Sequence, residues 1–243
     1  MGSNSNGLGF LFDDKAMDAE IRLLKSRSRG KRIEGELEAW GKNVPSRFKN
    51  ADINDFNSEP SVARAIGMVV AENAPLGSII LTGGGGRGKT YLAYAIAREL
   101  IKTGQLRFDQ FTYLSEDVFA AIYSSGFNKN ERIKGLKKSR LIIIDSVGVS
   151  DSSFTVSTQK SVNEQSRFNA WFDIADWAYS GGNHNRLIVT SGLGMKDLEK
   201  HVGSPAFARL RAASLGSINM SNLPDRREMI FNRDVGKFLG KGN

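Results

Sequence analysis

Five short runs of mostly apolar residues are spaced along the chain, and each predicts a buried β-strand. The run at 141–144 is apolar at four consecutive positions, which is typical of strands buried on both faces of a parallel sheet. The segments between the runs have the apolar spacing of helices. Strands that alternate with helices predict an α/β domain. The expected strands are 78–82, 110–114, 140–145, 187–191 and 217–220.

Two helix starts are marked by residues that favour the first turn. Pro60 begins one helix, because its ring fixes a backbone angle that suits this position. Ser115 is expected to cap another, since its hydroxyl can accept from a free N–H group. The apolar positions of that second helix predict an inward face formed by Val118, Ala121 and Ile122.

A polar stretch separates the third strand from the next helix. Residues 150–166 are rich in Ser and Thr and contain no Gly or Pro, so we expect a mobile insertion. The helix after it has an apolar face. Core packing of this face is favoured over a platform that stacks nucleic-acid bases. Its members are Phe168, Trp171, Phe172, Ala175 and Ala178.

The first 44 residues are interpreted as an N-terminal arm, followed by a core domain at 45–243. Residues 1–12 are rich in Gly, Ser and Asn, which favours disorder. Residues 13–40 favour a helix with Ile33, Leu37 and Trp40 on one face. The arm also carries a basic cluster, which is either a solvated helix face or a docking surface for a partner or for phosphates. This cluster is formed by Lys25, Arg27, Arg29, Lys31 and Arg32.

Charge and composition narrow the class of protein. The 243 residues carry a formal net charge of +8, which favours a polyanionic partner. No apolar run approaches the roughly 20 residues that a membrane span needs, so no membrane partner is expected. The chain contains no cysteine, which excludes disulfides and thiolate zinc sites and suits a reducing cytoplasm.

A glycine-rich loop follows the first strand and has the Walker A pattern Gly-x4-Gly-Lys-Thr. Glycines let the loop wrap phosphate oxygens with its N–H groups, and the following helix adds its positive end. Lys89 is expected to reach the β- and γ-phosphates of ATP, and the Thr90 hydroxyl to bind Mg2+. The expected nucleotide-binding residues here are Gly83, Gly84, Gly85, Gly86, Arg87, Gly88, Lys89, Thr90 and Tyr91.

The third strand ends in an acid, Asp145, as in a Walker B motif. Its position at the carboxyl end of a parallel strand is where α/β sheets bind ligands. Asp145 lies about 55 residues after the phosphate loop, with one strand and helix between, which strengthens the interpretation. We therefore expect Asp145 to hold the Mg2+ shell together with Thr90.

Together these motifs resemble the AAA+ ATPases of the DnaC/IstB group, which are replicative helicase loaders and transposase helper ATPases. The resemblance covers roughly residues 45–230. It implies a three-layer P-loop ATPase core with a five-stranded parallel sheet, nucleotide at a subunit boundary, and assembly on DNA. By the same resemblance Arg209 is the arginine finger of a neighbour's site, and Arg227 senses the subunit's own nucleotide. The segments that carry it are 45–51, 88–93, 144–148, 188–191, 208–210 and 225–227.

Three positions depart from that family. Ser146 stands where a second acid usually orients the attacking water, and serine cannot take a proton at neutral pH. Gly192 replaces a polar sensor residue, and Arg87 adds a cation that could strengthen phosphate binding. Slow hydrolysis is therefore expected with ATP binding intact, unless Asp151 or Glu116 supplies the missing acid.

The sequence thus predicts an ATP-binding helicase loader of a bacterial or phage replication system, in which ATP acts as an assembly switch. Expected partners are single-stranded DNA, a replicative helicase and further copies of the chain. The alternatives are a transposition helper that marks DNA for a transposase, and a nucleotide-stabilised scaffold without productive hydrolysis. A small-molecule kinase is disfavoured, because Arg209 and Arg227 suit a subunit boundary better than a lid.

Overall fold

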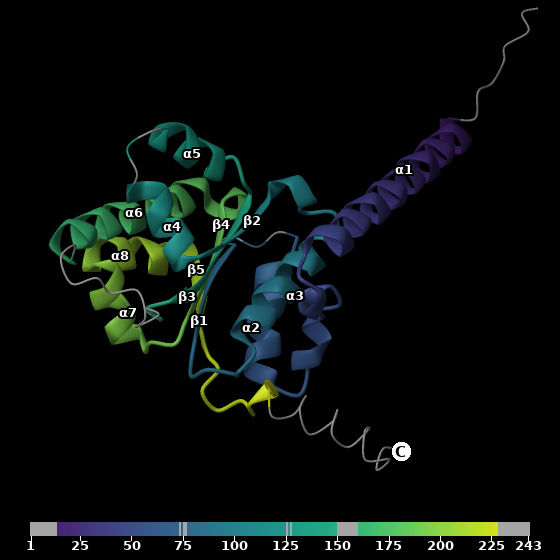
Figure 1. Cartoon of the computed structure of the whole chain (residues 1–243). Coiled ribbons are helices and arrows are strands. Elements are labelled where there is room, and N and C mark those ends of the chain that lie inside the picture. Colours follow the sequence, from purple (N-terminus) through teal and green to yellow (C-terminus); the bar gives the residue numbers. More distant parts are fainter. Residues whose placement is uncertain are drawn as a thin grey trace, which may run out of the picture.

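The computed structural model describes residues 14–72, 74, 77–124, 126, 128–149 and 160–227 (Figure 1). Its centre is a five-stranded sheet in the order β2-β3-β4-β1-β5, and every pair of neighbours is parallel. The five apolar runs are therefore confirmed as strands, with ends shifted by up to three residues. The strands are β1 (Ser78–Thr82), β2 (Phe111–Ser115), β3 (Leu141–Val147), β4 (Arg186–Ser191) and β5 (Ser214–Asn219).

Helices cover both faces of the sheet, which gives the expected three layers. Figure 1 shows α2 and α3 on one face, and α4, α6, α7 and α8 on the other. The longer helices are α1 (Asp14–Asn43), α2 (Pro60–Val70), α3 (Lys89–Lys102), α4 (Glu116–Ser124), α5 (Lys129–Leu136), α6 (Lys160–Gly181), α7 (Met195–Val202) and α8 (Ser204–Ala213). Short 3-10 turns are η1 (Ser46–Phe48), η2 (Ile53–Phe56), η3 (Phe108–Gln110) and η4 (Gly182–His184).

The residues of β1 alternate between two hydrophobic cores, because successive side chains of a strand point to opposite faces. Ile79 and Leu81 pack with α2 and α3, whereas Ile80 packs with α4, α6, α7 and α8. Both faces are buried, as the unbroken apolar runs predict. None of the described helices is long and apolar enough to cross a membrane.

The predicted inward face of α4 is confirmed for Ile122, which packs half-buried against the core, and is wrong for Val118 and Ala121. Val118 is 50% exposed, whereas Phe119 and Tyr123 are buried. The ring of Phe119 packs against that of Trp171 on α6, at 5.0 Å between centroids. Glu116 lies on the same inner face, because Phe119 and Tyr123 follow it by three and seven residues along the helix. The large aromatic rings fill most of the space above the sheet, whereas Val118 and Ala121 are exposed.

Part of the predicted insertion is helical instead. The helix α6 already begins at Lys160, so 160–166 are not a loop, and 150–159 lie outside the described residues. Core packing of the next turns is confirmed for Trp171, Ala175 and Ala178, which are buried. Phe172 differs from them, because it is 39% exposed.

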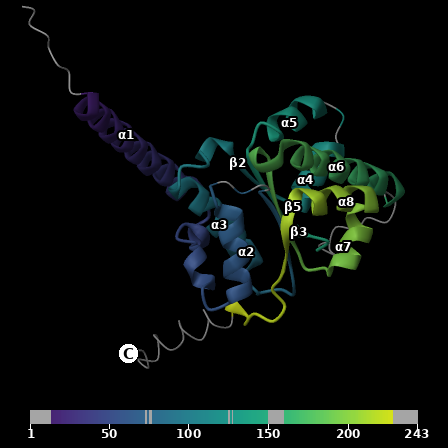
Figure 2. The same cartoon turned by 180° about the vertical axis from the view of Figure 1, so that it is seen from behind.

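The arm is a long helix, and α1 projects away from the core (Figures 1 and 2). Its last turns join the core: Trp40 is 1% exposed and lies 5.5 Å from the ring of Phe111. Glu36 accepts a hydrogen bond from the Phe108 N–H at 2.7 Å. Residues 1–13 lie outside the described part of the chain. The division at residues 44 and 45 stays a prediction, but a separable arm must end before Trp40.

Candidate nucleotide-binding site

The phosphate loop runs from the end of β1 to the start of α3, as the motif requires. Gly83, Gly86 and Gly88 have φ values of 129°, 76° and 86°, a region that favours glycine. A Cβ atom at Gly86 would lie 2.2 Å from the carboxylate of Asp225, and one at Gly88 would lie 2.8 Å from Arg226. The glycines therefore allow both the curved backbone and the close approach of the segment after β5.

Lys89 lies at the first position of α3, and its ammonium group closes the loop. Its Nζ atom donates to the carbonyls of Gly83 and Gly84 at 2.6 and 2.7 Å. Burial lowers the pKa of Lys89, Asp145 opposes this change, and the charges of Arg227 and Arg87 lower the pKa further. Three positive charges thus lie near one another at the loop, an arrangement that favours a phosphate ligand.

Asp145 and Thr90 meet although 55 residues separate them in the chain. The Thr90 hydroxyl donates to Asp145 Oδ1 at 2.8 Å, and Thr190 donates to the same oxygen at 2.5 Å. The other oxygen, Oδ2, accepts from Tyr113 at 2.8 Å and from Ser146 at 3.3 Å. Asp145 is only 5% exposed, and these hydrogen bonds fix the orientation of its carboxylate.

This pair of side chains fits a magnesium ion. A carboxylate and a hydroxyl are hard oxygen donors, which Mg2+ prefers, and Mg2+ usually takes few protein ligands beside its nucleotide. Thr90 and Asp145 would hold the ion at the edge of the sheet next to the phosphate loop. A magnesium ion held by Thr90 and Asp145 would neutralise charge on the phosphates of the nucleotide.

Ser146 follows Asp145 in a left-handed backbone conformation, with φ at 62°. Its N–H donates to Thr190 Oγ1 at 3.0 Å, and its side chain is exposed. The exposed Ser146 side chain therefore lies next to Asp145, and no acid stands at this position. Gly192 is also exposed and adds no polar side chain.

Glu116 is the acid that the sequence offers as a substitute, and its oxygens are already engaged. Oε1 accepts from His201 at 2.6 Å and from Trp171 at 3.2 Å, and Oε2 accepts from the Gly148 N–H at 2.7 Å. Burial alone would raise the pKa of Glu116, but these hydrogen bonds outweigh it and lower the pKa. Glu116 thus supports the chain after β3. The other substitute, Asp151, lies outside the described residues.

Arg226 is a residue that the sequence reasoning missed. Its N–H donates to Gly86 O at 2.9 Å, and its guanidinium group donates to Asp55 O at 2.7 Å. The same group lies 3.9 Å above the ring of Phe56 and 5.4 Å from that of Tyr91. Arg226 therefore joins η2, the start of α3 and the phosphate loop into one wall. The pair Arg226-Arg227 in the sequence could have indicated this role, but the resemblance assigns a nucleotide role to Arg227 alone.

The two neighbouring arginines have different surroundings. Arg227 is exposed, and its N–H donates to Asp225 Oδ1 at 2.8 Å. Its charge is one of the causes that lower the pKa of Lys89, and its role as a nucleotide sensor stays a prediction. Arg87 donates to the carbonyl of Leu223 at 2.5 Å, which ties the loop to the segment after β5. Tyr91 donates to Asp55 Oδ2 at 2.5 Å.

Arg209 lies on α8, on the opposite face of the sheet from α3. Its Nε atom donates to Asp176 Oδ1 at 2.7 Å, and its guanidinium group lies 4.1 Å above the ring of Phe172. Among the described residues, it contacts α6 and not the phosphate loop of its own chain. This placement suits a role at a neighbouring subunit.

Arg209→Ala is expected to weaken ATP-dependent assembly without weakening ATP binding by the single chain. Light scattering with and without ATP measures assembly, and titration with a fluorescent ATP analogue measures binding. Arg211→Ala is the matched control, because Arg211 is exposed on the same helix. Equal losses of assembly in both variants, or a loss of ATP affinity in the first, would contradict the arginine-finger assignment.

Comparison with known proteins agrees with this geometry. Residues 63–209 match the family model described as IstB-like ATP binding protein, a span that includes the phosphate loop, Asp145 and Arg209. No curated protein sequence matches the chain.

Solved structures share the fold at low sequence identity. A structure of DnaI is 21% identical, with a TM-score of 0.57, and the match covers 76% of this chain and 95% of that one. A DnaC helicase loader is 16% identical, with a TM-score of 0.54 and coverage of 72% and 99%. The replication initiator DnaA bound to AMPPCP and single-stranded DNA is 22% identical, with a TM-score of 0.52 and coverage of 77% and 55%.

Proposed function

The chain belongs to the family of IstB-like ATP binding proteins, within the AAA+ ATPases of the DnaC/IstB group, and from this premise we propose that it is an ATP-binding helicase loader in DNA replication. The observation that carries the proposal is the basic helix α1, which projects from the core that holds the phosphate loop (Figure 1). The similar structures support it, because they include a helicase loader and a replication initiator.

In this proposal ATP is an assembly switch. The loop N–H groups bind the phosphates, and Lys89 exchanges the carbonyls of Gly83 and Gly84 for phosphate oxygens. Thr90 and Asp145 hold Mg2+, and a neighbour's Arg209 completes the site. Ser146 offers no proton acceptor, so bound ATP persists and the assembled state lasts.

The partners follow from charge and from the arm. Single-stranded DNA is the polyanion that a net charge of +8 favours, and a replicative helicase is the protein that the arm would hold. Copies of the chain assemble around bound ATP. The cytoplasm of a bacterium or of a phage-infected host is the proposed location.

A transposition helper is the second candidate, because the matching family is named after an IstB protein. Such a helper would bind a transposase in place of a helicase. A scaffold without productive hydrolysis is a third candidate, supported by Ser146 and Gly192. Partner identity separates the first two, and turnover separates the third from both.

The deciding experiment is a pull-down with the full chain immobilised in the presence of ATP and Mg2+. Its bound proteins are read by mass spectrometry and then tested again as purified helicase and purified transposase. We expect the helicase to be retained with ATP and lost without it. Retention of the transposase alone would establish the second candidate instead.

Removal of residues 1–28 is expected to abolish helicase retention while ATP affinity stays within about twofold. The truncation keeps Trp40 in the core and keeps Arg29, whose Nη2 atom donates to Thr103 O at 2.6 Å. A chain that starts at Val44 would lack the buried Trp40, so a loss of helicase binding could then result from impaired folding instead of from the missing docking surface. Full helicase retention by the truncated chain would move the docking role to the core.

A further inference from the structure

One segment of α1 has the highest density of positive charge in the described part of the chain. Residues 22–32 contain six cations and no acid, and every cation is exposed. Four of them follow one another at intervals of three, four and three residues, so they lie on one face of the helix. These four residues, Arg22, Lys25, Arg29 and Arg32, are called the cationic stripe.

The charge of the stripe is not balanced by any described side chain. Among the residues whose side chains the structure describes, none of its members pairs with a carboxylate. The acids of α1 with described side chains begin at Glu34, beyond the stripe, and Lys42 pairs with one of them, Glu38. The stripe therefore retains its positive potential for an external anion.

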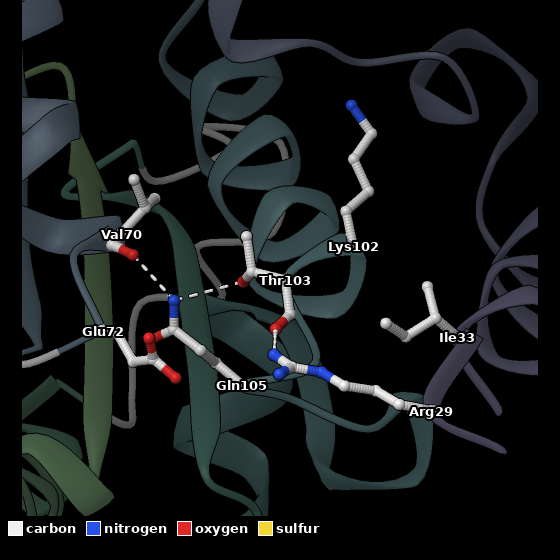
Figure 3. A pocket seen from close by; sticks show the side chains of 7 residues that line it. All are labelled: Arg29, Ile33, Val70, Glu72, Lys102, Thr103 and Gln105. Carbon is white, nitrogen blue, oxygen red and sulfur yellow. Dashed lines mark hydrogen bonds between the residues drawn. The ribbon is translucent and has the colours of Figure 1, made fainter. Parts of the chain in front are cut away.

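The stripe starts in open solvent and ends against the core. Arg29 donates to Thr103 O, and a side chain at Gly104 would meet Arg29 Nε at 3.2 Å and Arg32 Nη2 at 3.5 Å. A groove of about 430 Å³ lies beside this contact, between α1 and the ends of α2 and α3 (Figure 3). It is lined by Arg29, Ile33, Val70, Glu72, Lys102, Thr103 and Gln105. The stripe thus leads along the arm to a fixed place on the core.

We infer that the cationic stripe of α1 binds the phosphate backbone of a single nucleic-acid strand. Ten residues of helix are about 15 Å long, so the four cations can contact several phosphates in succession. The interiors of protein interfaces are depleted of charge, and the stripe contains no apolar side chain. At 100° per residue, the exposed Leu23 and Leu24 point away from the stripe, which leaves them for a protein partner.

This inference rests on the DNA-binding part of the proposed function and gives it a location. The arm would then have two binding surfaces on opposite sides of α1. Its cationic stripe would guide the strand towards the core, while Leu23 and Leu24 would serve the helicase. An acidic protein partner on the stripe is the competing explanation, and the experiment includes it.

The test compares two double variants of the full chain that remove the same charge from opposite sides of the helix. R22Q/K25Q alters the stripe, and R27Q/K31Q alters the other side. Binding of a labelled oligothymidylate is followed by fluorescence anisotropy with ATP between 50 and 200 mM salt. For a single strand, each lost phosphate contact lowers the slope of log K against log salt by about 0.7.

We expect the R22Q/K25Q slope to fall by about 1.4, and the R27Q/K31Q slope to fall by less than half as much. Equal changes, or no change in R22Q/K25Q while the wild type binds, would overturn the stripe and leave the proposed function standing. No binding by the wild type at any salt would overturn the DNA partner and the stripe with it. Binding of polyglutamate as tight as that of the oligonucleotide, lost in R22Q/K25Q, would favour the acidic protein partner.

A second observation concerns Tyr113 on β2 and is independent of the arm. Its hydroxyl donates to Asp145 Oδ2, the oxygen that does not contact Thr90. Its ring stacks on Tyr94 at 5.0 Å, and Tyr94 stacks on Phe48 at 4.4 Å. The hydroxyl group of Tyr113 is thus carried by a ring whose position is fixed by stacking.

The geometry points to Tyr113 as a positioning residue for the magnesium-binding carboxylate. By fixing Oδ2, it leaves Oδ1 beside the Thr90 hydroxyl, where the two would share the ion. Hydrogen bonds to metal ligands commonly change metal affinity by about 10- to 100-fold when they are lost. The same role in this chain predicts a change in magnesium dependence with little change in the affinity for free nucleotide.

Tyr113→Phe is tested by titrating a fluorescent ATP analogue at increasing Mg2+ and again in EDTA. We expect the Mg2+ concentration that gives half of the maximal gain in nucleotide affinity to rise about tenfold, while the affinity in EDTA stays unchanged. Tyr94→Phe is the control, because it keeps the stacked ring and has no described bond to Asp145. An unchanged magnesium requirement, an equal loss in EDTA, or the same shift in the control would overturn the assignment.

Discussion

Lys89→Ala is expected to weaken ATP binding at least tenfold. The substitution removes the ammonium group that closes the phosphate loop and would contact the β- and γ-phosphates. A charge-assisted hydrogen bond contributes about 1.5–3 kcal/mol, and about 1.4 kcal/mol corresponds to a factor of ten in affinity. Titration with a fluorescent ATP analogue measures the dissociation constant directly.

Lys42→Ala serves as the control for this variant. Lys42 is exposed at the end of α1, and its described ion pair is with Glu38, one turn away on the same helix. Its replacement removes the same charge without touching the loop, so ATP affinity should stay unchanged. A dissociation constant that is the same in Lys89→Ala and in the wild type would refute the nucleotide site itself.

The second large effect concerns turnover. The wild type is expected to hydrolyse ATP well below the range of about 1–1000 s⁻¹ that is common for enzymes, even with DNA present. Lys89 is proposed to supply the cation, Thr90 and Asp145 the magnesium ligands, and Arg209 a charge in trans. Ser146 can hydrogen-bond a water molecule but cannot accept its proton.

Ser146→Glu is expected to raise the rate, since a general base contributes about 100- to 10,000-fold. Ser146→Gln is the matched control, because it has a similar size and the same left-handed backbone position but no basic oxygen. Phosphate release by the three proteins gives the comparison. Rapid turnover by the wild type, or an equal rise in both variants, would show that another acid serves the site.

The local motifs could be predicted from the sequence because their geometry is set by neighbouring residues. The unbroken apolar run before Asp145 specifies a central parallel strand. Gly88, Lys89 and Thr90 specify the loop, since the glycine backbone and the first turn of α3 form together. Even the meeting of Asp145 with Thr90 follows from both lying at the carboxyl edge of one sheet.

Contacts across long sequence distances were not predictable in this way. Arg226 reaches Asp55 across 171 positions, and Tyr113 reaches Asp145 from the neighbouring strand. The local sequence around Arg226 and Tyr113 does not indicate the role of either residue. Two of the three residues predicted for the inner face of α4 were wrong for the same reason, because Phe119 packs against Trp171 on a helix distant in the sequence.

The burial of Trp40 shows how packing changes an interpretation based on composition. The change to Gly and Pro at 41–45 suggests a boundary, yet Trp40 lies in the core beside Phe111. The apolar spacing of Ile33, Leu37 and Trp40 was the better signal, because a face of this kind must be buried somewhere. The arm is thus anchored at one end, and its free part is the basic segment.

The central claim is that ATP bound at Lys89 switches the chain from single copies to an assembly on DNA. Sedimentation velocity of the full chain with Mg2+ and a single-stranded oligonucleotide, with and without ATP, tests it most directly. We predict a small species without ATP and a several-fold larger complex with ATP, while Lys89→Ala stays small under both conditions. The same sedimentation of the wild type with and without ATP would contradict the claim.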